Sequence, residues 1–156
     1  MAAPWIVYRA TAGDPLFAPT RIRYGGQVLP TGTVTFLFTD LEDSTRLWER
    51  DPEIMRAAVA RHDELLLACI ERHDGKVVKS TGDGVMAAFA DASQAVSAAV
   101  DGQRALGAET WSLPIAVRMG LHSGTAQPTD NDYHAPAVNR AARVAAAAHP
   151  GPPPPA

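Results

Sequence analysis

The order of strand-like and helix-like segments after residue 32 is the feature that most limits how this chain can fold. Residues 34–39, Val-Thr-Phe-Leu-Phe-Thr, form a β-branched and aromatic run that is typical of a buried central strand. Asp51 followed by Pro52 predicts the start of a long amphipathic helix, because aspartate caps helices and proline suits their first turn. The later segments are strand-like at 76–80 and 85–89, helical after an Asp91 cap, and strand-like again over 115–121. This order predicts an α+β fold with a ferredoxin-like βαββαβ core.

Two aspartates fall where predicted strands meet. Asp40 ends the first strand, and Asp83 lies in the turn Thr-Gly-Asp-Gly between the second and third strands. Right-handed crossovers place the first and third strands side by side and antiparallel, so these two points lie together. Adjacent carboxylates repel unless one is protonated or a cation lies between them, and oxygen ligands suit Mg²⁺ or Mn²⁺. A metal site is one interpretation; the other is a helix cap at Asp40 and a turn residue at Asp83, and spacing alone leaves both open.

Composition limits the partners and the compartment. A chain of 156 residues with 46% hydrophobic content suffices for one packed domain. The net charge of −3 with scattered basic residues predicts no nucleic-acid partner. The single cysteine, Cys69, cannot form a disulfide within the chain, and the N-terminal residues show neither a signal peptide nor a membrane span. We therefore expect a cytoplasmic protein with no membrane partner.

The two ends differ in composition from the body. Residues 1–31 contain prolines and glycines without a sustained period and are predicted to be an N-terminal extension or linker. Residues 149–156 form a proline-rich tail, which favours an extended conformation. The predicted domain therefore occupies residues 32–148.

Three separated motifs closely resemble class III adenylate and guanylate cyclase catalytic domains, most of all those of the bacterial, mycobacterial type. They are Gly-Thr-Val-Thr-Phe-Leu-Phe-Thr-Asp-Leu-Glu-Asp-Ser-Thr at 32–45, Lys-Ser-Thr-Gly-Asp-Gly at 79–84, and Asp132-Tyr133 running to Ala-Val-Asn-Arg-Ala-Ala-Arg at 137–143. Three motifs in the right order are far more specific than any one of them. The resemblance covers residues 32–148 and implies a cyclase domain that is incomplete at its C-terminus, because the family's domain continues with further strands. A sheet edge and an apolar surface are then expected to be uncovered.

The resemblance implies roles for residues at the predicted strand ends. Asp40, Leu41 and Asp83 would bind two divalent cations, Mg²⁺ or Mn²⁺. Lys79 and Asp132 would recognise the purine: an ammonium donates to adenine N1 and a carboxylate accepts from its exocyclic amine, which implies ATP over GTP. From the residues alone, Lys79 is better explained as an edge-strand lysine and Asp132 as a turn residue.

The third motif implies a second chain. Asn139 and Arg143 lie four residues apart and would share one face of a helix. In the family this pair stabilises the transition state across a head-to-tail dimer, so the resemblance implies a homodimer that converts ATP to 3′,5′-cyclic AMP and pyrophosphate. Without the resemblance, Arg143 would be interpreted as a solvated surface charge.

Two positions depart from the family's pattern near the site. Asp43 and Ala135 each stand where the family usually has glycine. Asp43 adds bulk and negative charge to the loop expected to approach the triphosphate, and Ala135 occupies a position where a positive φ is expected. The incomplete C-terminus, together with these departures, supports an alternative interpretation: a catalytically inactive or decayed cyclase-like module that binds nucleotide or dimerises for regulation.

Overall fold

The computed structural model describes residues 27–148, and most of the predicted N-terminal extension and the predicted tail at 149–156 lie outside that range. Its centre is a four-stranded antiparallel sheet in the order β2-β3-β1-β4. The strands are β1 (Gly32–Leu41), β2 (Lys76–Ser80), β3 (Val85–Phe89) and β4 (Val117–Ala126). The predicted antiparallel contact between the first and third strands is confirmed, with Thr35 opposite Phe89 and Phe38 opposite Met86.

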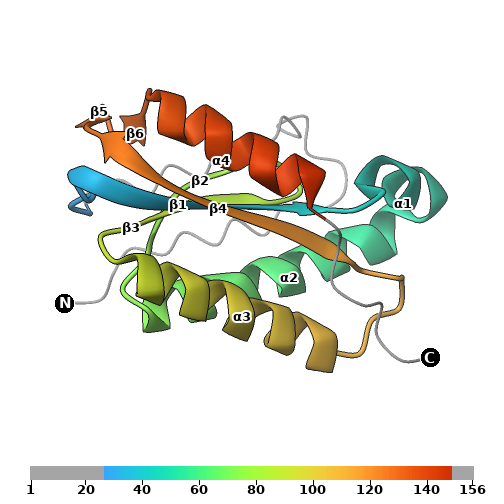
Figure 1. Ribbon diagram of the computed structural model, residues 1–156. Coiled ribbons are helices and arrows are strands. Elements are labelled where there is room, and N and C mark those ends of the chain that lie inside the picture. Colours follow the sequence, from blue (N-terminus) through green and yellow to red (C-terminus); the bar gives the residue numbers. More distant parts are fainter. Residues whose placement is uncertain (1–26, 149–156) are drawn as a thin grey trace.

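Helices cover both faces of the sheet (Figure 1). Helices α2 (Pro52–Arg72) and α3 (Ala92–Ala108) lie on one face, and α4 (Pro136–Ala147) lies on the other. The predicted α+β fold with a ferredoxin-like core is confirmed. Three short elements were not predicted: helix α1 (Ser44–Arg50) and the hairpin of β5 (Pro128–Thr129) and β6 (Asp132–Tyr133). None of the described helices is long and apolar enough to cross a membrane.

The two predicted helix caps are present. The Asp51 carboxylate accepts from the backbone N–H of Ile54 over 3.1 Å, with Pro52 in the first turn of α2. The Asp91 carboxylate accepts from the backbone N–H groups of Ser93 and Gln94 at the start of α3. Each bond satisfies a donor that the helix leaves unpaired, so both starts are fixed by local sequence.

Strand β1 is buried on both faces. Leu37 and Leu41 pack with the residues of α2 and α3, whereas Val34 and Phe36 pack under α4. This double burial explains why the strand is a continuous apolar run and does not alternate with polar residues. Because β1 lies between β3 and β4, its last residues lie in the middle of one end of the sheet.

Helix α4 lies unusually close to β4. A Cβ atom on Gly120 would overlap the backbone of Ala145, and one on Gly124 would come within 2.6 Å of the Ala137 Cβ atom. Glycine on the strand and alanine on the helix therefore let the two backbones approach. The position of α4 is set by this contact.

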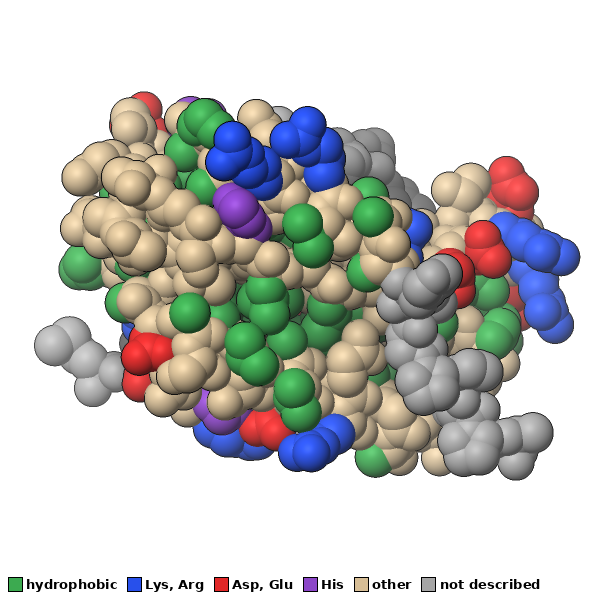
Figure 2. All heavy atoms as spheres, viewed as in Figure 1, with side chains coloured by type: hydrophobic (Ala, Val, Ile, Leu, Met, Phe, Trp, Pro, Cys, Tyr) green, Lys and Arg blue, Asp and Glu red, His purple; other side chains and the backbone are tan. Residues whose placement is uncertain are grey.

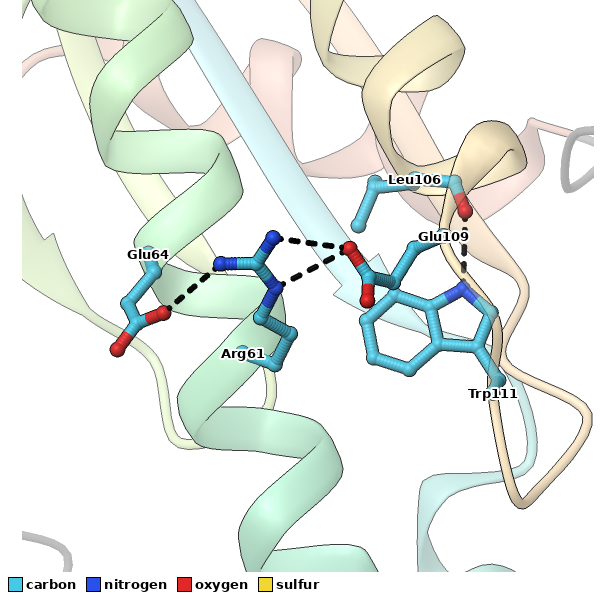
Figure 3. Close-up of polar contacts among 5 residues, drawn as sticks. All are labelled: Arg61, Glu64, Leu106, Glu109 and Trp111. Carbon is cyan, nitrogen blue, oxygen red and sulfur yellow. Dashed lines mark hydrogen bonds and ion pairs between the residues drawn. The ribbon is translucent and has the colours of Figure 1, made fainter.

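The loop between α3 and β4 is fastened to α2 (Figure 3). Arg61 donates from Nε and Nη2 to one Glu109 oxygen over 3.1 and 3.0 Å, and from Nη1 to Glu64 over 3.1 Å. The Trp111 indole N–H donates to the Leu106 carbonyl over 2.9 Å and so satisfies an acceptor in the last turn of α3.

Strand β4 is an edge strand of the described sheet. Its Met119 and Leu121 side chains are half-buried, and Figure 2 shows hydrophobic atoms along the middle of this face, between α4 and α3. The lysine and arginine side chains on the same face form separate groups and no continuous basic patch (Figure 2).

Candidate active site

The end of β1 meets the turn between β2 and β3. The Leu41 N–H donates to the Asp83 carbonyl over 3.1 Å, and the Val85 N–H donates to the Thr39 hydroxyl over 3.0 Å. A Cβ atom on Gly84 would overlap the Thr39 carbonyl, so the turn needs glycine to come this close. The chain thereby brings Asp83 beside the end of the strand that carries Asp40.

Asp40 and Asp83 line one open pocket. Its other lining residues come from the end of β1, the β1–α1 loop, helix α1 and β4: Leu41, Asp43, Ser44, Thr45, Arg46, Glu49 and Arg118. The Leu41 side chain is buried in the core, so Leu41 can present only its main chain there. The three residues that sequence analysis assigned to metal binding are therefore neighbours.

Arg118 neutralises Asp40 from the adjacent strand. The two residues face each other in the β1–β4 register, and Arg118 donates from Nε to one carboxylate oxygen over 2.9 Å and from Nη2 to the other over 2.6 Å. A third bond runs from Nη1 to the Ala146 carbonyl near the end of α4, over 3.2 Å. The Asp40 carboxylate raises the pKa of the Arg118 guanidinium above its usual value. Sequence analysis missed Arg118; the antiparallel register of β1 and β4 is the signal that identifies it.

Asp83 is held by the start of α1. The Ser44 hydroxyl donates to its Oδ2 atom. Ser44 follows Asp43, which has a φ of 53° in the left-handed region and makes no side-chain cap. Asp43 therefore occupies a backbone conformation that suits glycine, the residue that the family usually has at this position.

The chemistry of the pocket fits a hard divalent cation. The carboxylates of Asp40 and Asp83 and the main-chain carbonyl of Leu41 are oxygen ligands of the kind that such an ion prefers, and the carboxylates of Asp43 and Glu49 also line the pocket. Within residues 27–148, no group of three or more histidine, cysteine, aspartate or glutamate side chains is placed to hold a metal. Mg²⁺ or Mn²⁺ bound here would complete its shell with water or phosphate oxygens, as Mg²⁺ does in phosphoryl-transfer sites.

Lys79 and Asp132 contact each other although 53 residues separate them. The Lys79 ammonium on β2 donates to both Asp132 oxygens, over 2.9 and 3.1 Å. Partial burial raises the pKa of Asp132, but the bonds from Lys79 and from the Tyr133 N–H outweigh it and leave the pKa below its usual value. A donor and an acceptor for a ligand's polar edge are thus brought together.

Tyr133 fastens the segment before β1 to this region. Its hydroxyl donates to the Pro30 carbonyl over 2.6 Å, and Gln27 donates to the Val77 carbonyl over 2.6 Å. Burial raises the pKa of Tyr133 to about 12. Leu29, which belongs to the predicted N-terminal extension, is 7% exposed and packs in the core under α4.

Asn139 and Arg143 lie on the outer side of α4. Both side chains are exposed, whereas Ala137, Ala141 and Ala145 face the sheet. A shift of two residues turns a helical position to nearly the opposite side, so the two sets diverge. Neither Asn139 nor Arg143 lines the pocket of Asp40 and Asp83 within one chain.

The expectation at Ala135 is wrong. Its φ is −135°, in the extended region that any L-residue adopts. A glycine at the corresponding family position is therefore no sign that this chain needs a positive φ there.

Comparison with known proteins identifies the family. Residues 27–152 match the adenylate and guanylate cyclase catalytic domain. An uncharacterized protein of Mycobacterium tuberculosis is 44% identical over 124 residues, which span 78% of this chain and 42% of that protein. An adenylate cyclase of Lachancea kluyveri is 33% identical over 149 residues, which span 78% of this chain and 8% of that enzyme. The chain therefore spans less than half the length of these relatives.

The fold matches a solved cyclase structure as well. A monomeric adenylate cyclase of Trypanosoma brucei superposes with a TM-score of 0.72 at 28% sequence identity, covering 80% of this chain and 73% of that one. Sequence and fold agree with the motifs at 32–45, 79–84 and 132–143. This chain belongs to the family of class III adenylate and guanylate cyclase catalytic domains.

Proposed function

We propose that this domain converts ATP to 3′,5′-cyclic AMP and pyrophosphate with two divalent cations, Mg²⁺ or Mn²⁺. The observation that carries the proposal is the pocket in which Asp40, Leu41 and Asp83 lie together. The ribose 3′-hydroxyl would attack the α-phosphorus while the bond to the bridging oxygen of pyrophosphate breaks. Bound cations would supply Lewis-acid activation of that hydroxyl and charge neutralisation of the leaving group.

The choice of ATP over GTP rests on Lys79 and Asp132. An ammonium and a carboxylate within 2.9 Å of each other offer one donor and one acceptor at the same place. Adenine presents the complementary acceptor at N1 and donor at its amine, whereas guanine presents a carbonyl and an N–H there. A site that bonds a specific edge rejects a base that leaves its polar groups unpaired.

The proposed assembly is a head-to-tail homodimer. Asn139 and Arg143 are exposed on the outer side of α4 and lie outside the pocket of their own chain. A partner chain would receive them at its own pocket, where the asparagine would orient the ribose and the arginine would stabilise charge on the phosphate.

The test is product formation by the purified chain with Mn²⁺ and either ATP or GTP, followed by mass spectrometry. We expect cyclic AMP from the wild type and none from Asp40→Ala, with folding of both verified by circular dichroism. Glu71→Gln, which removes an exposed carboxylate near the end of α2, is the control and should retain activity. Cyclic AMP formation that survives in Asp40→Ala would rule out the metal assignment, and a preference for GTP would rule out the assignment of Lys79 and Asp132.

A second candidate is a domain that binds nucleotide without turning it over. The observation that favours it is Asp43, whose carboxylate adds negative charge to the pocket lining. Calorimetry with Mn²⁺ and ATP would distinguish the two functions: binding without any cyclic nucleotide product selects the second.

A further inference from the structure

Arg118 contacts both strand β1 and helix α4, which carry two different motifs of the sequence. Its guanidinium contacts both oxygens of Asp40 on β1 and the carbonyl of Ala146 on α4. The side chains of Arg118 and Asp40 are 28% and 32% exposed, so the pair lies at the pocket wall where a ligand can reach it.

We propose that Arg118 is a positioning residue that competes with a divalent cation for Asp40 and so makes metal binding depend on nucleotide. The inference rests on the proposed metal site. A cation at that site needs at least one oxygen of Asp40, and both oxygens accept from Arg118. The cation would also lie beside a guanidinium of like charge.

A triphosphate would remove both the competition for the Asp40 oxygens and the repulsion between the cation and the guanidinium. Its oxygens offer the guanidinium a bidentate partner in place of Asp40, because arginine binds phosphate and carboxylate with the same planar geometry. The same oxygens add negative charge that attracts the cation. Metal and nucleotide should therefore bind with positive coupling, and Arg118 should be the source of part of it.

The third bond of Arg118 links this exchange to α4. Ala146 lies in the last turn of the helix, where carbonyl groups lack partners within the helix. An arginine that turns toward a triphosphate withdraws its donor from that turn. The helix that carries Asn139 and Arg143 therefore loses this hydrogen bond when a triphosphate occupies the pocket.

The test measures the Mn²⁺ dissociation constant by calorimetry, with and without a non-cyclisable ATP analogue. Without nucleotide, we expect Arg118→Gln to bind Mn²⁺ about tenfold more tightly than the wild type, since it loses a charged hydrogen-bond pair with Asp40. The Mn²⁺ dissociation constant without the analogue, divided by the constant with it, should be smaller in Arg118→Gln than in the wild type by a similar factor. A merely structural role would weaken Mn²⁺ binding in this variant, because a damaged site loses affinity.

Two further variants separate the causes. Arg118→Lys keeps the charge but cannot bond both oxygens, and we expect an intermediate gain of about threefold. This variant carries the test if Arg118→Gln does not fold. Arg46→Gln removes another arginine of the same pocket, and no bond between Arg46 and Asp40 is observed in the described chain; it should change the Mn²⁺ constant less than Arg118→Lys does.

The outcomes distinguish this inference from the proposed function. Equal Mn²⁺ affinity in the wild type and both Arg118 variants, or an equal gain in Arg46→Gln, overturns the role of Arg118 while the metal site stands. Mn²⁺ binding that is absent from the wild type, with and without the analogue, overturns the metal site itself.

Discussion

Lys79 and Asp132 form an ion pair of 2.9 Å between β2 and the short strand β6, with both side chains about one third exposed or less. Each residue therefore already has a partner of opposite charge, which a base must share or replace. A pair at this exposure contributes little to folding, up to about 1 kcal/mol. Its effect should be far larger on nucleotide recognition than on stability.

We predict that Lys79→Met lowers kcat/KM for ATP by about a hundredfold, because the proposed charged hydrogen bond to the base is lost. The free energy of unfolding in urea should change by less than about 1 kcal/mol. Lys76→Met, a lysine of the same strand, is the matched control and should leave kcat/KM within about threefold, the range expected where no bond to the reacting ligand is lost. Equal losses in both variants would refute the recognition role.

Asp43 combines a left-handed backbone with a charge in the pocket lining, and two substitutions separate these effects. We expect Asp43→Asn and Asp43→Gly to raise affinity for the Mn²⁺ complex of an ATP analogue several-fold if the charge is the cause, since both remove it. If the backbone conformation is the cause, only Asp43→Gly should do so. Calorimetry measures both, and weaker binding in both variants would instead make Asp43 a ligand of the complex.

Gly120→Ala should destabilise the domain. A Cβ atom there overlaps the backbone of Ala145, which cannot move aside as a flexible side chain would. The expected loss in free energy of unfolding is about 1–3 kcal/mol. Gly107→Ala is the control: this helical glycine of α3 has no atom within 4 Å of the added Cβ. It should stabilise the domain by about 0.5–1 kcal/mol. Urea denaturation of both variants tests the contrast, and a neutral Gly120→Ala would disprove the close packing.

The contact between α2 and α3 should depend on pH through His73. Its Nε2 atom lies 2.7 Å from Asp101, and its Nδ1 atom lies 3.0 Å from Gln94. The bonds to Asp101 and then Gln94 raise the pKa of His73 above its usual 6.5. A raised pKa means that the protonated residue stabilises the fold below pH 6.5 and that this stabilisation is lost as pH rises through the folded pKa.

The measurement is the Tm of wild type and His73→Gln at successive pH values from about 5.5 to 8.5, a window that brackets the ordinary pKa of histidine. The difference in Tm should be largest at the acidic end and shrink as pH rises. Asp101→Asn should reduce the same difference, because it removes the first partner. A difference that does not vary with pH would exclude the charged pair.

The sequence was sufficient to predict the elements that depend on local capping residues or on hydrophobic periodicity. Asp51 and Asp91 cap the helices they precede, and the strand order follows from the sequence of elements and the handedness of crossovers. The neighbouring positions of Asp40 and Asp83 followed from the same topology. These features needed no knowledge of side-chain packing.

What the sequence did not predict depends on register and on very short elements. Arg118 reaches Asp40 only because the β1–β4 register sets them opposite each other, and a slip of one residue would turn its side chain to the other face. Helix α1 has 7 residues and β5 and β6 have 2 each, too few to show a period. The error at Ala135 came from equating a family glycine with a positive φ.

The glycines of β4 have a consequence for how the site tolerates change. Helix α4 contacts the main chain of β4 at Gly120 and Gly124. Its distance from the sheet is therefore set there by backbone atoms and not by the size of a side chain. Substitutions in the core on the opposite face of the sheet, under α2 and α3, leave this contact between α4 and β4 in place. The outward positions of Asn139 and Arg143 should therefore tolerate substitutions in the core under α2 and α3.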